Sequence, residues 1–543
     1  MANINSNSDE KLKNLSREII EFLLEHPKIS KNSFTNLKGK IGKRYQYHKV
    51  IKNATILNYA SPAERERLSH ILKRRETRSI SGVSVIAIMT KPLYCPGNCI
   101  YCPGKESQPG EKVAQSYTGK EPAAMRSIHN NYDSFAQVQS RIQDLKAIGH
   151  KVDKIELIIM GGTFLASDTT YQENFVTGAY GGVINSRSQS LSEVLKLAET
   201  SKRRIIGLTI ETRPDFCKEV DVDKMLNYGA TRVEIGIQTV YDEIYRLIRR
   251  GHTTRDSIEA IRIAKDSGLK VNAHIMPNLP YTTYAQDMEM FDVLFTDPDY
   301  KPDMLKIYPC LVIKGTELYD WWKKGVYSPY SNDKMVELIA QGKLKIPPYV
   351  RIQRIMRDIP APLIEAGCNK SNLRQLVQNR LRELNRKCNC IRCREYGLST
   401  KNVDFNKDIL KNVREYRLDY EASSGQEIFL SLENKERNIL IGYLRLRKPS
   451  EFAHRSELND GKTMIVREVR VVGELVPKDK RPYKETQVQH LGYGKLLMNS
   501  AEKIAAEDFD TKNLAVISGI GARDWFYELG YKLDGPYVSK MLL

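Results

Sequence analysis

Short apolar runs alternate with helix-like segments through the middle of the chain. Each run is of strand length and rich in β-branched residues, and the stretches between the runs, such as RDSIEAIRIAKDSG, place apolar residues at helical spacing. Repeated strand–helix units favour a parallel sheet. The pattern predicts an α/β fold, a partial (β/α)6 barrel, with strands near 82–90, 154–162, 204–211, 232–238, 270–276 and 304–309.

The pattern changes after about residue 410. EIFLSLE, ILIGYLRLR and TMIVREVRVVGELV look like antiparallel strands, and a helix, a strand, a second helix and a last strand follow them. This order without strand–helix regularity indicates an α+β domain. We therefore expect four regions, a basic N-terminal region at 1–80, the barrel at 81–309, a linker at 310–405 and the α+β domain at 406–543.

Charge adds a partner class to this picture. The 543 residues carry a formal net charge of +19, and residues 1–80 hold 17 Lys and Arg against 8 Asp and Glu. The segments 39–49 and 71–78 interleave basic residues with Tyr45 and Tyr47, which suits phosphate contacts with some stacking. A solvated basic helix face is the alternative, and RNA, DNA and acidic proteins all stay open as partners.

The apolar runs are too short to span a membrane, and the polar N-terminal segment lacks the apolar core of a signal peptide. We therefore expect a cytoplasmic protein without membrane contact, in which clustered cysteines bind metal or take part in catalysis rather than form disulfides. The oligomeric state stays open.

The loop LYCPGNCIYCPGK spaces Cys95, Cys99 and Cys102 as C-x3-C-x2-C after the first predicted barrel strand. Three thiolates on one loop can ligate three irons of a [4Fe–4S] cluster and leave the fourth iron open. Structural zinc would need a fourth ligand, which this loop lacks, and a purely structural loop is the remaining alternative. The loop belongs at the C-terminal mouth of the barrel, where barrel enzymes build their sites.

This arrangement resembles the radical S-adenosylmethionine (SAM) superfamily, and the resemblance implies that the open iron binds SAM. In the same resemblance, MGGT after the second strand and polar residues after the third and fourth strands would contact SAM. The alternatives are a simple turn for the glycines and a structural ion pair or hydrogen bond for the polar residues. These SAM-binding candidates are Gly161, Gly162, Thr163, Glu211, Arg213 and Gln238.

VREVRVVGELV followed by QHLGYG and an amphipathic helix is the second informative pattern. Glycines before a helix let backbone N–H groups approach a pyrophosphate, although an unrelated strand–turn–helix could show the same order. The order resembles GNAT acetyltransferases, which implies an acetyl-CoA site. Its candidate residues are Glu468, Val469, Arg470, Val471, Gln489, His490, Leu491, Gly492, Tyr493, Gly494 and Phe526.

GNAT enzymes often use a tyrosine as the acid for the departing thiolate, and Tyr527 is the candidate here. The pattern departs from the related proteins, which have two adjacent tyrosines at the positions of Trp525 and Phe526. One residue along a helix turns a side chain by about 100 degrees, so these aromatic residues could instead be packing residues.

A radical SAM barrel and a GNAT domain behind a basic N-terminal region resemble the Elongator catalytic subunit family in its archaeal or bacterial stand-alone form. Strings such as SYTGKEPAAMR, RIMRDIPAP and YLRLRKPSE carry the resemblance from about residue 20 to the end. It implies a tRNA uridine acetyltransferase that forms 5-carboxymethyluridine at the wobble uridine. A SAM-derived 5′-deoxyadenosyl radical would activate the acetyl methyl group of acetyl-CoA for addition to C5, and an electron donor not identified by the sequence would reduce the cluster.

The family resemblance also implies that Lys154 approaches acetyl-CoA, a surface lysine being the alternative, and that a structural zinc joins the two domains. Cys388, Cys390 and Cys393 in KCNCIRC are its predicted ligands. Four-coordination demands one more, for which Cys310 is chosen over Cys368, while Cys217 is expected to be structural and free thiols are the alternative to zinc. Linker cations that could contact tRNA are Arg351, Arg354, Arg357, Lys370 and Arg374.

Two functions of other classes compete with this hypothesis. One is a protein lysine acetyltransferase in which the cluster is only structural. The other is a nucleic-acid-binding scaffold with vestigial sites, which the intact cysteine triad of the loop disfavours.

Overall fold

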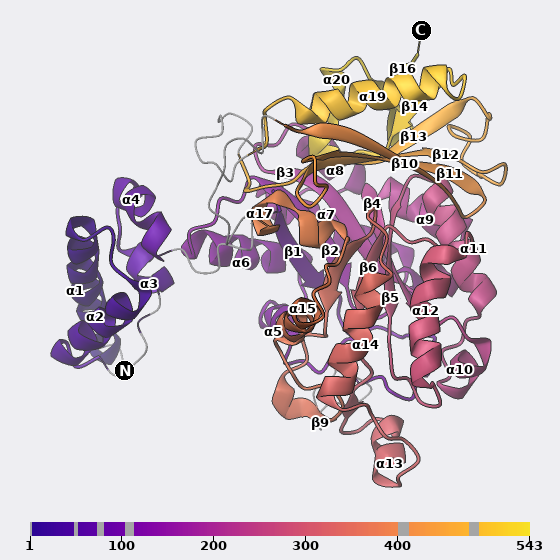
Figure 1. Cartoon of the computed structure of the whole chain (residues 1–543). Coiled ribbons are helices and arrows are strands. Elements are labelled where there is room, and N and C mark those ends of the chain that lie inside the picture. Colours follow the sequence, from indigo (N-terminus) through magenta and orange to yellow (C-terminus); the bar gives the residue numbers. More distant parts are fainter. Residues whose placement is uncertain are drawn as a thin grey trace.

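The computed structural model describes residues 3–47, 51, 53–72, 81–103, 113–399, 412–476 and 488–542. Figure 1 shows a helical bundle at the N-terminus, a parallel sheet surrounded by helices, and a mixed sheet that carries the C-terminus. Residues 48–49 and 73–78 of the two basic segments lie outside the described residues, as does part of the linker.

The N-terminal bundle has its own small core. Its helices are α1 (Asn3–Glu25), α2 (Lys31–Arg44), α3 (Asn53–Asn58) and α4 (Pro62–Leu72). Apolar residues at helical spacing, such as Leu15, Ile19 and Leu23 of α1, are fully buried against the other helices. The basic N-terminal region is therefore a folded helical unit in its described part.

Seven parallel strands form the large sheet in the order β1-β2-β3-β4-β5-β6-β8. Six of them lie at the predicted runs, namely β1 (Ser84–Met89), β2 (Lys154–Met160), β3 (Arg204–Thr212), β4 (Ala230–Gln238), β5 (Lys270–Ile275) and β6 (Met304–Ile307). The edges β1 and β8 do not pair with each other, which confirms a partial barrel.

The seventh strand, β8 (Arg351–Ile355), comes from the stretch predicted to be a linker. It pairs in parallel with β6, from Met304 opposite Arg351 to Ile307 opposite Ile355. Its sequence RIQRI has only two strong apolar residues, so periodicity could not distinguish it from a loop. The barrel sheet thus extends beyond residue 309.

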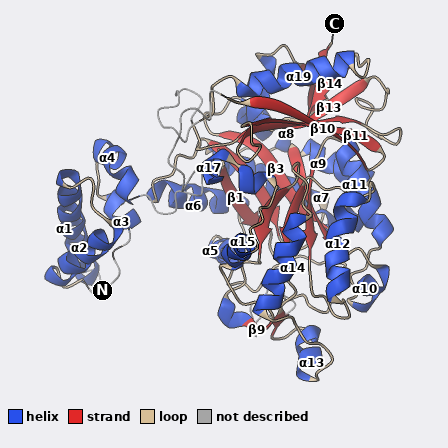
Figure 2. Cartoon of the chain, viewed as in Figure 1, coloured by secondary structure: helices blue, strands red, loops and turns tan. Residues whose placement is uncertain are grey.

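Helices cover the outer face of this sheet (Figure 2). Four of them follow Asp133, Ser190, Thr253 and Thr283, whose side chains accept a hydrogen bond from the backbone N–H three residues on, as N-caps do. The helices are α5 (Pro122–His129), α6 (Ser134–Ala147), α7 (Thr169–Ile184), α8 (Leu191–Glu199), α9 (Glu219–Asn227), α10 (Asp242–Leu247), α11 (Thr254–Asp266), α12 (Tyr284–Thr296), α14 (Asn332–Leu344) and α15 (Leu373–Glu383). Among the described residues, no helix is long and apolar enough to cross a lipid bilayer.

The C-terminal domain is the predicted α+β unit. Its sheet has the order β10-β11-β12-β13-β14-β16-β15 and carries two helices, α19 (Tyr493–Glu507) and the short α20 (Arg523–Tyr527). The strands are β10 (Arg414–Ala422), β11 (Gly425–Glu433), β12 (Leu440–Lys448), β13 (Thr463–Val471), β14 (Asn513–Val516), β15 (Lys532–Asp534) and β16 (Tyr537–Met541).

One pair of strands in this sheet is parallel and separates half-way. β13 and β14 are paired from Thr463 opposite Asn513 to Val466 opposite Val516, but β13 continues to Val471 while β14 ends. The second half of β13 therefore leaves an opening between the two strands. This opening positions the second cavity described below.

Buried charges join the two sheets. Arg467 of β13 donates to Asp303, just before β6, at 2.9 Å and to Glu427 of β11 at 2.9 Å, and all three side chains are fully buried. Arg447 of β12 donates to Asp266 of α11 at 2.7 Å. Since buried ions need partners in a fixed geometry, this network fixes the C-terminal domain against the barrel.

Candidate active site

Alternation along the barrel strands turns a row of polar side chains inward. In β2, Ile155, Leu157 and Ile159 are fully buried beneath the helices, whereas Glu156 and Ile158 line a cavity inside the sheet. The same period of two places alternate residues of β4 and β5 in that cavity. The interior of the partial barrel is therefore a chemical site and not an apolar core.

The predicted cluster loop borders this cavity, whose volume is about 420 Å³. Cys95, Cys99 and Cys102 are half-buried and all line it. Arg250 donates to the Cys99 sulfur at 3.6 Å, so a cation lies directly beside one of the predicted cluster ligands. Among the described residues the three sulfurs form no group close enough to share one ion. This wider spacing suits a cubane, in which each sulfur binds a different iron.

The predicted SAM-binding residues lie at the ends of neighbouring strands around the same cavity. Gly162, Thr163, Glu211, Arg213 and Gln238 line it. The buried Nη1 of Arg213 and the buried Oε1 of Gln238 have no hydrogen-bond partner among the described residues. Buried polar atoms normally have partners, so these two atoms fit a polar ligand in the cavity.

Gly161 contributes through its backbone. It has a φ of 123°, and a Cβ there would lie 2.3 Å from the Thr90 hydroxyl oxygen. Only glycine adopts this conformation without strain. The turn after β2 thus needs Gly161, which does not itself line the cavity.

A charge network lines the cavity, and of its members only Glu211 was among the predicted site residues. Lys306 of β6 contacts Glu234 of β4 and donates to Glu211 of β3 at 3.2 Å. His274 of β5 lies 2.9 Å from Glu234. Burial opposes ionisation of Glu234, but Lys306 and His274 outweigh it and hold the pKa of Glu234 well below its usual range. Lys306, Glu234 and His274 come from three different strands, so no local sequence motif identified them.

A second cavity of about 230 Å³ lies where β13 and β14 separate, between the C-terminal domain and the start of the barrel strands. All four predicted acetyl-CoA residues of β13, together with Gln489 and Phe526, line it, and so does Lys154. The residues from β13 are Glu468, Val469, Arg470 and Val471.

The glycine loop before α19 is connected to this cavity through one side chain. Lys154 donates to the side-chain Oε1 of Gln489 at 2.9 Å, and its Nζ lies 3.3 Å from Nε2 of His490. His490, Leu491, Gly492, Tyr493 and Gly494 do not themselves line the cavity. Gly492 has a φ of 88° and precedes the first turn of α19, so the loop presents the helix N-terminus beside the cavity.

The structure corrects the expectation for Tyr527. Its hydroxyl donates to Glu199 of α8 at 2.7 Å, and Arg523 forms an ion pair with the same carboxylate at 3.2 Å. Trp525 and Phe526 line the cavity, whereas Tyr527 does not, because the helix turns each successive side chain by about 100 degrees. Burial and Glu199 also raise the pKa of Tyr527 to about 12. Tyr527 is therefore a contact between domains and not a thiolate acid in this geometry.

Lys270, the first residue of β5, lines the cavity and was missed by sequence reasoning. Its Nζ lies 3.4 Å from the carbonyl oxygen of Arg467. Burial lowers the pKa of Lys270 to about 8, although Glu468 opposes this effect. A lysine at a strand start carries no sequence signal, since only the packing of two domains buries it.

The two cavities share part of their lining. Residues from β2, β4 and β13 and from the segment before β1 border both of them, namely Ser81, Val83, Glu156, Arg232 and Arg470. Glu156 and Arg232 form an ion pair at this boundary. The two cavities are thus neighbours with a common wall, the first bordered by the cluster loop and the second by Gln489 of the glycine loop.

Comparisons with known proteins agree over nearly the whole chain. Family models match at residues 12–80 (ELP3 N-terminal domain), 92–294 (Radical SAM superfamily) and 302–383 (Radical_SAM C-terminal domain). The chain is 47% identical to the tRNA uridine(34) acetyltransferase of Methanocaldococcus infernus, over 90% of this chain and 91% of that protein. It is 42% identical to Elongator complex protein 3 of Homo sapiens, over 97% of this chain and 96% of that protein.

The chain belongs to the Elongator complex protein 3 family. A solved structure of the archaeal Methanocaldococcus infernus family member, with an N-terminal deletion (1–46), superposes with a TM-score of 0.75 at 44% identity. It covers 85% of this chain and 100% of that chain. The radical SAM half-barrel and the mixed C-terminal sheet are thus the architecture of this family.

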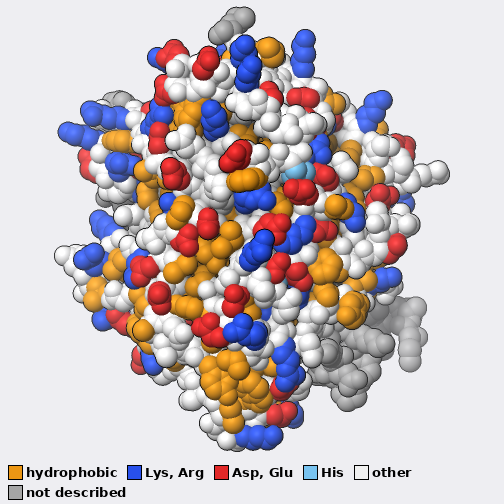
Figure 3. Space-filling model, turned by 90° about the vertical axis from the view of Figure 1, so that its right-hand side faces the viewer, with side chains coloured by type: hydrophobic (Ala, Val, Ile, Leu, Met, Phe, Trp, Pro, Cys, Tyr) orange, Lys and Arg blue, Asp and Glu red, His pale blue; other side chains and the backbone are white. Residues whose placement is uncertain are grey.

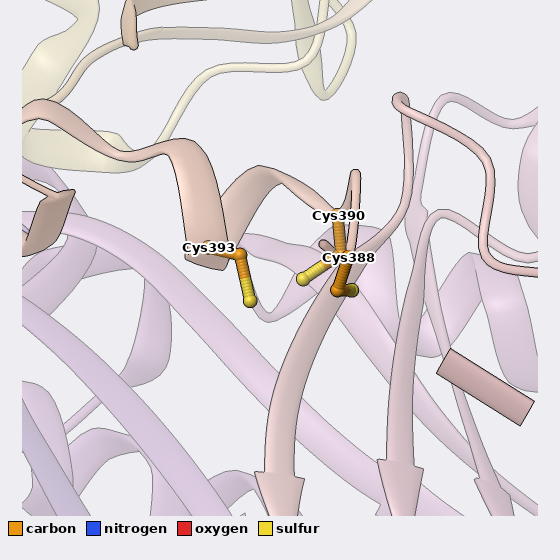
Figure 4. A group of neighbouring side chains, drawn as sticks. All are labelled: Cys388, Cys390 and Cys393. Carbon is orange, nitrogen blue, oxygen red and sulfur yellow. The ribbon is translucent and has the colours of Figure 1, made fainter. Parts of the chain in front are cut away.

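A second cysteine group of this family member lies outside both cavities. The sulfurs of Cys388, Cys390 and Cys393 lie within 4.8 Å of one another, two from a loop and one from the short helix α16 (Ile391–Arg394), as Figure 4 shows. The fully buried Lys343 of α14 donates to the Cys393 sulfur at 3.5 Å. Converging soft ligands beside a cation fit one zinc ion with anionic thiolates.

The expected fourth ligand is not there. Cys310 packs with Ile100, Met276 and Tyr327 beside the cluster loop, and it is not part of the close group of sulfurs. Its strand β6 leads to the mouth of the barrel, so chain direction carries it away from the three thiols. Cys217 is fully buried in the barrel core, as expected for a structural residue.

Burial changes the role of several predicted tRNA contacts. Arg351 is 4% exposed and donates to Glu395 at 2.6 Å, so it does not face solvent. Arg354 and Arg357 line the cluster cavity, while Lys370 is exposed. In the N-terminal bundle, Lys40, Lys43 and Arg44 are exposed, whereas Tyr45 and Tyr47 pack against the bundle core.

Proposed function

We propose that this chain is a tRNA uridine acetyltransferase that uses SAM and acetyl-CoA to form 5-carboxymethyluridine at the wobble uridine. Close relatives of 42–47% identity carry the name tRNA uridine(34) acetyltransferase or Elongator complex protein 3. The observation that carries the proposal is the shared lining of the two cavities. Two adjacent cavities with a common wall would bring radical chemistry close to an acetyl thioester.

Both the radical SAM barrel and the C-terminal domain are needed, because uridine C5 is not nucleophilic enough for simple acyl transfer. When bound, the [4Fe–4S] cluster and SAM supply a 5′-deoxyadenosyl radical that can take a hydrogen atom from the acetyl methyl group. Cys95, Cys99 and Cys102 would ligate three irons. Arg213 and Gln238 would orient SAM through their unpartnered polar atoms.

The residues of the second cavity would hold acetyl-CoA. The N-terminus of α19 favours the pyrophosphate, and the separated strands β13 and β14 leave edge backbone groups for the pantetheine arm. Lys154 holds the glycine loop through Gln489 and so positions this arm.

Hydrolysis of the thioester releases the carboxymethyl product. A water oxygen forms the new C–O bond while the C–S bond breaks, and the leaving thiolate needs one proton. We assign this proton to the ammonium group of Lys270, which regains a proton from the attacking water. Lys270 is buried in the cavity, and its pKa of about 8 suits an acid at neutral pH.

Zinc and tRNA complete the proposal. Cys388, Cys390 and Cys393 would bind one zinc ion and stabilise the segment between the domains, with a fourth ligand other than Cys310. The exposed cations of the N-terminal bundle would contact tRNA phosphates.

The decisive experiment combines reconstituted, dithionite-reduced enzyme with SAM, acetyl-CoA and tRNA, and measures 5′-deoxyadenosine and modified uridine by mass spectrometry. We expect both products from the wild type and neither from Cys99→Ala. Acetylation of a lysine peptide without either product would instead identify a protein lysine acetyltransferase.

A further inference from the structure

A short helix, α13 (Glu317–Lys323), projects from the foot of the molecule in Figure 1 and carries the sequence ELYDWWK. Figure 3 shows hydrophobic side chains gathered at this end of the molecule. Tyr281 and Val326 are 58% and 53% exposed, and three aromatic residues of α13 are half-buried. We call this surface the aromatic knob, formed by Tyr281, Tyr319, Trp321, Trp322 and Val326.

The knob is attached directly to the predicted cluster loop. The Leu318 N–H donates to the carbonyl oxygen of Ile100 at 3.0 Å, and Ile100 stands between Cys99 and Cys102 in the sequence. Ile100, Leu318 and Ile248 belong to one buried apolar cluster, with Cys99, Cys102 and the three α13 aromatic residues packed against it. A single apolar layer thus separates the knob from two of the cluster ligands.

Positive charge surrounds the knob. Lys314, Lys323 and Lys324 are exposed, and the one nearby acid on α13 besides the paired Glu317 is Asp320. Glu317 is neutralised by Arg249, which donates to it at 2.9 Å and 2.6 Å. An acidic partner is therefore complementary to this surface.

The aromatic rings are poorly placed for stacking with nucleic-acid bases. The ammonium group of Lys323 lies over the Trp322 ring at 5.0 Å and near the Tyr319 ring at 5.6 Å. Trp321 packs edge-on against Tyr281 at 6.1 Å. Because the ring faces already have partners, an apolar protein surface ringed by acids fits the knob better than RNA.

We propose that the aromatic knob is the docking surface for a small acidic electron-carrier protein. This inference rests on the proposed function, which requires one electron for each SAM cleaved. The cysteine sulfurs face the internal cavity, where SAM and substrate bind, so a protein donor must approach from the outer side of the loop. The reduced carrier loses one electron, the [4Fe–4S] centre gains it, and no proton moves.

The test compares two charge-reversed variants of equal net charge, K323E/K324E at the knob and K462E/K512E on the exposed far end of the C-terminal sheet. A plant-type ferredoxin is the probe. Binding of the oxidised ferredoxin to cluster-free enzyme is measured by calorimetry. With reconstituted enzyme, 5′-deoxyadenosine formation is measured with ferredoxin reduced by NADPH and its reductase, and separately with dithionite.

We expect K323E/K324E to bind ferredoxin at least about tenfold more weakly and to lose about tenfold of the ferredoxin-driven rate. Its dithionite-driven rate and tRNA binding should stay within about twofold of wild type, as should every rate of K462E/K512E. Raising the salt concentration should reduce the difference between the two variants.

Three results would overturn the docking surface. The first is unchanged ferredoxin binding in K323E/K324E. The second is an equal loss of the dithionite-driven rate in that variant, which would mean a structural role for the two lysines. The third is a loss of tRNA binding, which would mean that the knob is an RNA-binding surface. A wild type that makes no 5′-deoxyadenosine with dithionite would overturn the proposed function instead, and the calorimetry on cluster-free enzyme would then decide the docking surface by itself.

Discussion

At the scale of single residues, two lysines at the starts of barrel strands β2 and β5 line the second cavity but have different surroundings. Lys154 contacts Gln489 and His490, whereas Lys270 donates to the backbone carbonyl oxygen of Arg467 at 3.4 Å. Burial lowers the pKa of each to about 8. The difference in contacts, and not in acidity, separates a positioning residue from a candidate acid.

Replacing Lys270 by Met should lower kcat for tRNA-stimulated acetyl-CoA hydrolysis by about 100-fold with little change in KM, since it removes the proton donor. The matched change Lys154→Met should raise KM about tenfold and leave kcat within a few-fold. Steady-state kinetics with a thiol-reactive dye measures both.

The pH profile checks the assignment. Because the protonated lysine is the acid, wild-type kcat should fall as pH rises through about 8. Lys270 faces Glu468, Arg232, Glu156 and Arg467. The pKa values of Glu468 and Glu156 are lowered and that of Arg467 is raised, so these three groups keep their charge in that range. Lys154→Met should retain the alkaline limb and Lys270→Met should lose it. An alkaline limb that survives in Lys270→Met would refute the assignment.

Tyr527 supports a prediction of the opposite kind. Tyr527→Phe should leave acetyl-CoA turnover within about twofold of wild type, because the hydroxyl bonds to Glu199 and not to the cavity. Unfolding stability should fall by about 1 kcal/mol, as is usual for a lost hydrogen bond. Urea unfolding and the kinetic assay measure the two effects, and a hundredfold loss of kcat would restore Tyr527 as the acid.

At the scale of elements, the cysteine segment around α16 shows how chain direction selects ligands. Cys388, Cys390 and Cys393 converge because the loop turns into α16 within a few residues. Cys310 follows β6 and emerges at the barrel mouth instead. Spacing along the chain could group the first three but could not place the fourth.

Zinc content should follow this geometry. Cys390→Ser should lose the bound zinc and lower Tm, because structural zinc sites contribute to folding directly. Cys310→Ser should retain one equivalent of zinc per chain, measured by atomic emission. Retention of zinc in Cys390→Ser, or its loss in Cys310→Ser, would show that the ligand set is different.

At the scale of the whole molecule, the buried ions between the two sheets decide how the cavities meet. Burial alone would raise the pKa of Asp303, but Arg467, Lys265 and Arg445 hold it well below its usual range. Burial also raises the pKa of Glu427, but Arg467 lowers it, and the net effect is a lowered pKa. Arg467 and Lys265 act on both carboxylates, with Arg445 added at Asp303 and Arg447 at Glu427, and these basic residues keep both carboxylates ionised.

Arg467→Met should destabilise the enzyme by about 3–5 kcal/mol, since it leaves buried carboxylates without their main partner. The matched surface change Arg417→Met removes an exposed pair with Asp508 and should cost at most about 1 kcal/mol. Chemical denaturation measures both changes. Similar small effects for the two variants would mean that the network does not hold the domains together.

The pH dependence of stability has a definite sign. Groups with lowered folded pKa values contribute their stabilisation above the unfolded pKa of about 4 and lose it only as pH falls through the folded value. In Arg467→Met the folded pKa values of Asp303 and Glu427 rise, so acid unfolding should begin at a higher pH than in wild type.

The sequence by itself determined the elements and the motifs. Apolar runs predicted six of the barrel strands because buried parallel strands need them, and the cysteine and glycine loops were recognisable because their residues are neighbours in the chain. Only the tertiary structure revealed strand β8, the place of Lys270 in the second cavity and the ion pairs of Lys306. It also established where Cys310 and Tyr527 lie. Each of these depends on contacts between residues far apart in sequence, which local periodicity does not encode. The wall that the two cavities share likewise forms only where the barrel strands pack against β13 of the C-terminal domain.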